Sequence, residues 1–65
     1  MDLVLYLGRL QALVEARHHD QPLHNLWTRM LIKIQSRRMA ITLVNKIIDH
    51  WDLSADEIIM CDQVA

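Results

Sequence analysis

The sequence predicts a small all-α protein, and three observations point to this class. One glycine and one proline are the only strong helix breakers among 65 residues. No Asn-Gly or Asp-Gly pair marks a β-hairpin. Apolar residues recur at the three- and four-residue spacings of helical faces. We expect a single domain over residues 1–65, a small helical hairpin or three-helix protein with a long central amphipathic helix, dimeric in solution.

The first helix is expected over residues 2–18. Asp2 is placed to cap its first turn with a side-chain oxygen. Gly8 lies inside the helix, where glycine costs about 1 kcal/mol relative to alanine. The helix presents one apolar face. It consists of Leu3, Tyr6, Leu7, Leu10, Leu13 and Val14.

The second helix is expected over residues 22–51, because Pro22 suits the first helical position. Its apolar residues follow a heptad pattern, except that Arg37 fills one seam position. The apolar stripe of the second half is rotated by roughly 80° from that of the first, whereas a straight helix drifts only about 20° per heptad. Either the chain turns near residues 35–38, with Ser36 capping a new helix, or one long helix meets different neighbours at its two ends. We favour the long helix.

Length and composition together indicate a partner chain. A helix of about thirty residues would span about 45 Å, whereas a compact chain of this size is about 28 Å across. Hydrophobic residues are 52% of the sequence, and so short a chain buries only about 60% of its unfolded surface. Cys61 is the single cysteine, so no disulfide within the chain adds stability.

We therefore predict a homodimer, or a complex with another protein, formed through the central helix. Tryptophan and arginine are enriched at interface hot spots, so we expect at least one of the two tryptophans at the interface. The predicted interface consists of Leu23, Trp27, Met30, Ile34, Arg37, Arg38, Ile41, Val44, Ile48 and Trp51.

A third helix is expected over residues 54–63. Ser54 and Glu57 have the spacing of a capping box, in which each side chain accepts a hydrogen bond from the backbone N–H of the other residue. This pattern places the N-cap at Ser54 and a helix boundary just before it.

Charge is divided between two segments of the chain. Residues 21–48 hold five bases and no acid, and residues 49–65 hold five acids and no base. Such blocks pair with each other, within or between chains, or present separate charged faces to partners. Alternatively both are solvated faces whose ion pairs contribute about 0–1 kcal/mol each. We expect Arg37 and Arg38 to meet acids of the C-terminal segment or of a partner.

A second interpretation is a small DNA-binding transcriptional regulator. Residues 44–64 have the outline of a degenerate helix-turn-helix, but Asp52 takes the turn position usually filled by glycine. The acids of its second helix would repel phosphates, so the basic central helix is the better nucleic-acid surface. The bases concerned are Arg29, Lys33, Arg37 and Arg38.

Three further classes are less favoured by the residue patterns. The histidine-rich turn, His18, His19, Asp20 and His24, suggests a metal-stapled module but matches no defined zinc spacing. A basic helix with tryptophans near its ends would suit an anionic membrane surface. The sequence has no phosphate-binding glycine loop, no nucleophile elbow and no cysteine pair, so its motifs do not favour an enzyme.

We therefore expect a non-enzymatic regulatory or adaptor protein without a cofactor, acting by helix-mediated protein–protein interaction. No apolar run approaches the about 20 residues of a membrane span. The N-terminal residues lack the basic-then-apolar order of a signal peptide, and a lone cysteine fits a reducing compartment. We expect a soluble, cytoplasmic protein.

Overall fold

The computed structural model describes residues 2–64 and is all-helical within that range. It has four helices and no strand among these residues, so the predicted all-α class is confirmed. The hairpin and three-helix architectures are replaced by a four-helix one. The helices are α1 (Leu3–Glu15), α2 (Gln21–Ile32), α3 (Arg37–His50) and α4 (Ala55–Asp62).

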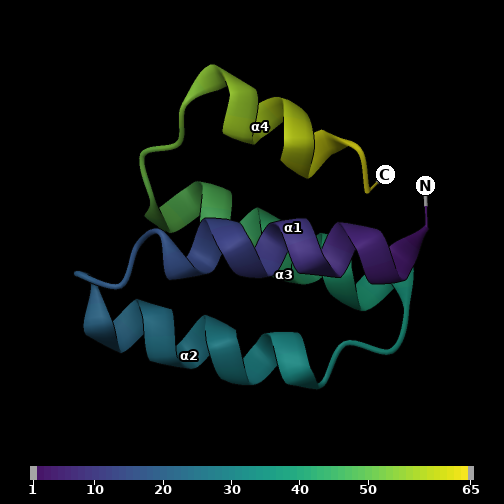
Figure 1. Cartoon of the computed structure of the whole chain (residues 1–65), viewed down its shortest axis with the longest axis horizontal. Helices are drawn as coiled ribbons and strands as arrows, with labels where there is room; N and C mark the ends of the chain where they lie inside the picture. Colours follow the sequence, from purple (N-terminus) through teal and green to yellow (C-terminus); the bar gives the residue numbers. More distant parts are fainter. Residues whose placement is uncertain (1, 65) are drawn as a thin grey trace.

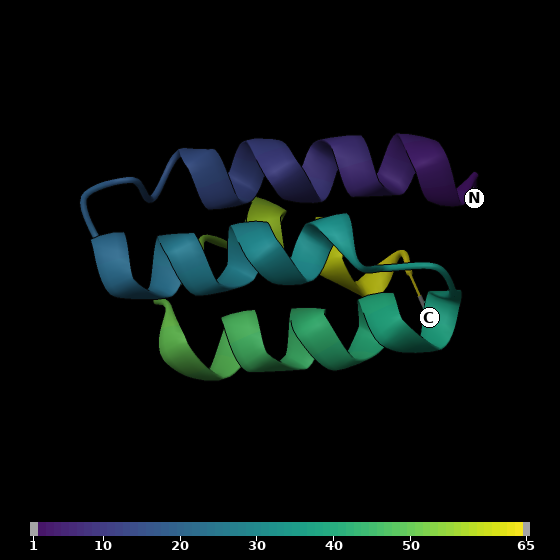
Figure 2. The same ribbon diagram turned by 90° about the horizontal axis from the view of Figure 1, so that it is seen from below.

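The helices are arranged around one shared core. In Figure 1, α1 lies in front of α3, α2 runs below this pair and α4 runs above it. Seen from below, α1, α2 and α3 alternate in direction, with α1 and α3 flanking α2 (Figure 2). The molecule measures 29 × 26 × 17 Å. Consequently α2 and α4 lie on opposite sides of the chain.

The start of α1 is the capped turn that the sequence predicts. Asp2 has an extended backbone, and its Oδ1 accepts a hydrogen bond from the backbone N–H of Val4 at 3.0 Å. The helix ends at Glu15, three residues before the predicted end, and a turn over residues 16–20 leads to α2. Pro22 stands in the first turn of α2, where its missing N–H leaves no hydrogen bond unmade.

The favoured single long helix is wrong, because the chain turns between Ile32 and Arg37. Ser36 adopts an extended backbone, with φ −148° and ψ 159°, and its Oγ accepts a hydrogen bond from the N–H of Met39 at 3.3 Å. The rotation between the two apolar stripes follows from this turn, since α2 and α3 approach the same core from different sides. The overhanging helix that required a second chain is therefore absent from residues 2–64.

The core draws on all four helices. Trp27 and Trp51 pack edge to face, with ring centroids 4.1 Å apart and planes at 85°. The indole Nε1 of Trp51 donates a hydrogen bond of 2.8 Å to Oδ2 of Asp20, which fixes the turn before α2 against the end of α3. The buried apolar residues are Tyr6, Leu10, Leu13, Val14, Trp27, Ala40, Leu43, Val44, Ile47, Trp51, Cys61 and Val64.

Helix α4 begins at the predicted capping box and is held by polar contacts to α1 and to the turn that follows α1. The Ser54 and Glu57 side chains each accept the other's backbone N–H. The Tyr6 hydroxyl donates to the Cys61 carbonyl at 2.9 Å in a buried position. Near the other end of α4, Arg17 and Glu57 form an ion pair of 2.7 Å. These contacts hold a helix of only eight residues on the bundle.

Candidate functional site

The sequence-predicted seam lies mostly inside the single chain. Trp27, Val44 and Trp51 belong to the core, and the two tryptophans are 1% and 8% exposed. The remaining apolar members are partly buried and pack against that core; they are Leu23, Met30, Ile34, Ile41 and Ile48. A side chain buried within its own chain leaves little surface for another. A role for this seam between chains stays a prediction, and the surface left over for partners has to be sought elsewhere.

The basic residues are divided between elements because the central helix is broken. Arg29 lies on α2, Lys33 follows its end, and Arg38 and Lys46 are exposed on α3. Arg37 lines a small hollow beside residues of α1 and of the C-terminal segment, where its neighbours include Gln63 and Val64. The continuous basic helix expected for nucleic-acid binding is therefore not formed.

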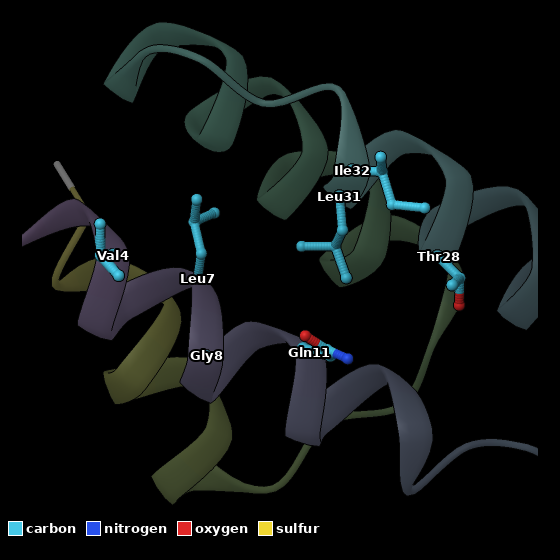
Figure 3. Close-up of a pocket in the computed structure, with 7 residues that line it drawn as sticks. All are labelled: Val4, Leu7, Gly8, Gln11, Thr28, Leu31 and Ile32. Carbon is cyan, nitrogen blue, oxygen red and sulfur yellow. The ribbon is translucent and has the colours of Figure 1, made fainter.

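An apolar opening lies between α1 and α2, and Figure 3 shows its lining. This α1–α2 groove has a volume of about 350 Å³. Because the two helices are antiparallel, the N-terminal half of α1 faces the C-terminal half of α2 (Figure 2). The lining residues are Val4, Leu7, Gly8, Gln11, Thr28, Leu31 and Ile32.

Two aliphatic side chains stand almost fully in water at the mouth of the α1–α2 groove. Val4 is 75% exposed and Ile32 is 80% exposed. Below them Leu7 and Leu31 are half-buried and pack against the core, so the apolar surface runs from the mouth to the floor. Leaving such area in water is unfavourable by about 25 cal/mol per Å² of apolar surface.

Gly8 keeps the groove open midway along α1. A Cβ placed at this residue would meet nothing within 4 Å. The backbone does not require glycine, since no described residue has a positive φ. Glycine in the middle of a helix costs about 1 kcal/mol relative to alanine, and here neither packing nor backbone geometry within the chain offsets that cost.

The two polar side chains in the groove are bonded to their own helices. Gln11 donates from Nε2 to Oε1 of Glu15 at 3.3 Å, and the Thr28 hydroxyl donates to the carbonyl of His24 at 2.8 Å. Neither group needs a hydrogen bond from an incoming molecule. The α1–α2 groove is therefore built to accept aliphatic or aromatic side chains.

The buried groups that could have been nucleophiles are held protonated. Burial raises the pKa of the Cys61 thiol, and the negative charges of Asp62 and Glu57 raise it further. Burial is also the main cause of the raised pKa of Tyr6, whose hydroxyl donates to the Cys61 carbonyl. A protonated, buried thiol is a poor nucleophile, so both residues act in packing.

Across residues 2–64, no three His, Cys, Asp or Glu side chains are grouped so that they could hold a metal ion. Within the same range no helix has both the length and the apolar character to cross a membrane.

Sequence reasoning missed the α1–α2 groove, although a signal for it was present. Val4 and Ile32 are aliphatic residues that lie off the predicted apolar faces of their helices. Exposed apolar residues that gather in one patch are candidates for contact with another molecule. The groove itself depends on which sides of α1 and α2 pack together, and the sequence of either helix alone does not determine that packing.

Comparison with known proteins leaves this geometry as the only guide to function. No family model, no curated protein and no solved structure matches the chain.

Proposed function

We propose that the chain is a non-enzymatic protein-interaction module, a small regulator or adaptor, that forms a homodimer through the α1–α2 groove. The observation that carries the proposal is an open apolar groove with Gly8 on its wall and Ile32 exposed at its mouth. A destabilising glycine and a solvated isoleucine are both accounted for if a second molecule covers them.

A second copy of the chain suits this groove for two reasons. In a two-fold dimer the same patch contacts itself, so Val4 and Ile32 of each copy are covered by the apolar surface of the other. The net charge is −1, so two copies approach each other with little long-range repulsion. Both the protruding side chains and the groove that receives side chains lie on the same face.

The required contact area is available on this face. A stable interface buries about 800 Å² on each partner. The chain exposes 4363 Å² in total, of which 800 Å² is about a fifth. One face formed by two of four helices offers a share of this size, and the α1–α2 face runs along the length of the molecule (Figure 2).

Replacing Ile32 by aspartate tests the dimer without disturbing the fold. Ile32 is 80% exposed at the C-terminal end of α2, so we expect the substitution to lower the free energy of unfolding of the monomer by no more than about 1 kcal/mol, mainly because an acid is unfavourable at the end of a helix. Placing a charge in an apolar interface should weaken the dimer by at least about 100-fold. Light scattering across a concentration series measures the mass of the wild type and of the variant.

The matched control is Ile59→Asp on α4. Ile59 is also exposed, at 59%, but α4 lies on the opposite side of the bundle from α2. We expect this variant to remain dimeric. A wild-type chain that stays monomeric at several hundred micromolar, or an Ile59→Asp variant that dissociates as readily as Ile32→Asp, contradicts the proposal.

A further inference from the structure

We infer that the α2–α3 hairpin docks on the surface of a membrane that contains anionic lipids. The surface concerned, here called the α2–α3 face, is formed by exposed side chains of two neighbouring antiparallel helices (Figure 2). The inference stands independently of the proposed dimer, because the α1–α2 groove uses other residues of α2. The residues of the α2–α3 face are Leu26, Arg29, Lys33, Arg38, Met39 and Lys46.

On α2, the residues of this face lie away from the groove toward α1. Leu26, Arg29 and Lys33 follow one another at intervals of three and four residues, so they share one side of the helix. None of them lines the α1–α2 groove. Because α1 and α3 flank α2, a dimer formed through that groove leaves the side toward α3 open (Figure 2).

On α3, the side that adjoins α2 is identified by a ring contact. His50 packs edge to face on Trp27, with ring centroids 5.9 Å apart. Lys46 and Met39 precede His50 by four and eleven residues, spacings that return to the same side of a helix. Arg38 is next to Met39 in the first turn of α3 and is exposed. Exposed residues of α2 and α3 therefore form one continuous surface.

The α2–α3 face carries an excess of positive charge that its own residues do not cancel. Its four bases are exposed, and none of them forms an ion pair within residues 2–64. Asp49 is the only acid between residues 21 and 50. It follows Lys46 by three residues, so it reduces the charge near the end of α3. The other three bases, Arg29, Lys33 and Arg38, lie toward the turn between the helices and have no acid beside them on either helix.

The acids of the other elements lie off this face. Asp2 and Glu15 stand at the two ends of α1, which is on the other side of α2 from α3 (Figure 2). Asp20, at the opposite end of α2 from the turn, accepts the indole N–H of Trp51. The residues after α3 hold four acids and no base, and α4, which carries three of them, is on the opposite side of the bundle from α2 (Figure 1). An anionic surface therefore attracts the α2–α3 face and repels α4, which orients the molecule.

Exposed apolar side chains beside the bases decide which anionic partner fits. Leu26 is 44% exposed and Met39 is 42% exposed. The phosphates of a nucleic acid would pair with the bases but leave both apolar side chains in water. The interface of an anionic bilayer takes up aliphatic side chains while its headgroups attract lysine and arginine, so both kinds of residue are accommodated.

The aromatic residues support the same choice. Proteins that bind single-stranded nucleic acid stack its bases on aromatic side chains. Tyr6, Trp27 and Trp51 are at most 8% exposed, and the sequence has no phenylalanine. The tryptophans that the sequence suggested for a membrane surface are thus buried as well, and Leu26 and Met39 are the side chains of this face that enter the bilayer interface.

Co-sedimentation with vesicles tests the α2–α3 face directly. The probes are vesicles of phosphatidylcholine with about 30% phosphatidylserine and vesicles of phosphatidylcholine alone. We expect the chain to bind the anionic vesicles at least about tenfold more tightly, with an affinity that falls as salt is raised. Equal binding to the two kinds of vesicle, or no binding to the anionic vesicles at millimolar lipid, overturns the inference.

Matched charge reversals separate this face from general attraction to anionic lipid. Arg38→Glu places an acid in the first turn of α3, where it suits the helix dipole and should not weaken the fold. It should weaken vesicle binding about 25-fold, because each unit of charge near an anionic surface changes the affinity about fivefold. Arg9→Glu is an equal charge change on α1, where the Arg9 guanidinium donates to Gln63, and should weaken binding less than about threefold. Equal effects of the two variants contradict the inference.

A second pair of variants tests the apolar contact, which a nucleic acid or an acidic protein does not require. Met39→Gln is matched by Ile58→Gln on α4, because the two side chains are 42% and 40% exposed. Met39→Gln should weaken binding to anionic vesicles about threefold or more, whereas Ile58→Gln should leave it unchanged. Tighter binding of random duplex DNA or of polyglutamate than of anionic vesicles assigns the bases to nucleic acid or to an acidic protein, and overturns the inference.

Spin-labelled lipid locates the contact. In bicelles of the anionic composition, the methyl signals of Leu26 and Met39 should broaden, and those of Ile58 and Ile59 should not. The reverse pattern contradicts the inference. A monomeric chain that binds anionic vesicles contradicts only the proposed dimer, and a dimer that binds both kinds of vesicle equally contradicts only this inference.

Discussion

At one end of the bundle, where α1 ends and α2 begins, polar and aromatic side chains form hydrogen bonds, an ion pair and ring contacts with one another. Trp27 packs on Trp51, Asp20 accepts from the indole of Trp51, and the guanidinium of Arg17 lies 5.8 Å from the ring centroid of Trp51 while pairing with Glu57. We call this the tryptophan end. Its contacts are almost all directed inward.

The opposite end, where α1 begins and α2 ends, leaves aliphatic side chains exposed to solvent. Val4, Leu5 and Ile32 are each at least 65% exposed there. We call this the open end. The same two helices therefore contribute stability at one end and a binding surface at the other, which teaches that apolar content in a short chain is divided between folding and association. Substitutions at the two ends should differ in whether they change the fold or the mass of the molecule.

The largest effect is expected at the tryptophan end, from Trp27→Ala. Truncating a buried aromatic residue costs about 3–5 kcal/mol, which is as much as a single core of this size supplies. We expect the variant to be largely unfolded at 25 °C, with loss of helical circular dichroism. Leu26→Ala is the control, since Leu26 is the neighbouring residue and is 44% exposed. Equal urea midpoints for the two variants would show that the tryptophan pair does not hold the fold.

A smaller effect is expected from the titration of Glu57. The backbone N–H of Ser54 is the largest cause that lowers the pKa of this carboxyl below its usual 4.5, and the Arg17 guanidinium lowers it further, against the opposing effect of burial. Because the pKa is lower in the folded state, the stabilisation is complete above about pH 4.5 and is lost as pH falls through the folded value.

Urea unfolding of Glu57→Gln against the wild type measures this contribution. We expect a difference of about 1 kcal/mol at pH 7, from the negative charge that strengthens the cap hydrogen bond and forms the partly screened ion pair, and this difference shrinks toward zero in acid. Glu15→Gln is the control, because Glu15 is exposed and forms no ion pair within residues 2–64. A Glu57 difference that is independent of pH would contradict this assignment.

The helix caps at both ends of the bundle could be predicted from the sequence, whereas the exposed apolar side chains of the open end could not. Asp2, Ser36 and Ser54 are side chains whose capping role depends on residues two or three positions away, so local sequence is enough to find them. Ser36 also shows where local reasoning fails: the heptad spacing favours one long helix, whereas the rotated apolar stripe and the Ser36 cap favour the turn that the structure has.

The α1–α2 groove depends on the pairing of two helices and on which residues that pairing leaves outside. The sequence of α1 alone does not show whether Gly8 has a function or is only a destabilising residue that the helix tolerates. The sequence of α2 alone does not show that Ile32 is exposed to solvent. The sequence predicts at least one of Trp27 and Trp51 at an interface between chains; that role stays a prediction, and both side chains are buried within the chain. Their burial inside the chain depends on the turn at Ser36, which brings the end of α3 back beside the start of α2.

The smallest effect, and the one that separates the two ends most clearly, is expected from Gly8→Ala. A methyl group here meets nothing within 4 Å, so the monomer should gain about 0.8 kcal/mol from the better helix former. The same methyl narrows the groove that the proposed dimer fills, so the dimer should weaken although the fold is strengthened. Unfolding measured in the Ile32→Asp background isolates the first change, and light scattering on the single variant measures the second. Ala12→Gly, on another side of α1, should do the opposite to the fold and nothing to the dimer; if Gly8→Ala instead strengthens both fold and dimer, the groove is not where the copies meet.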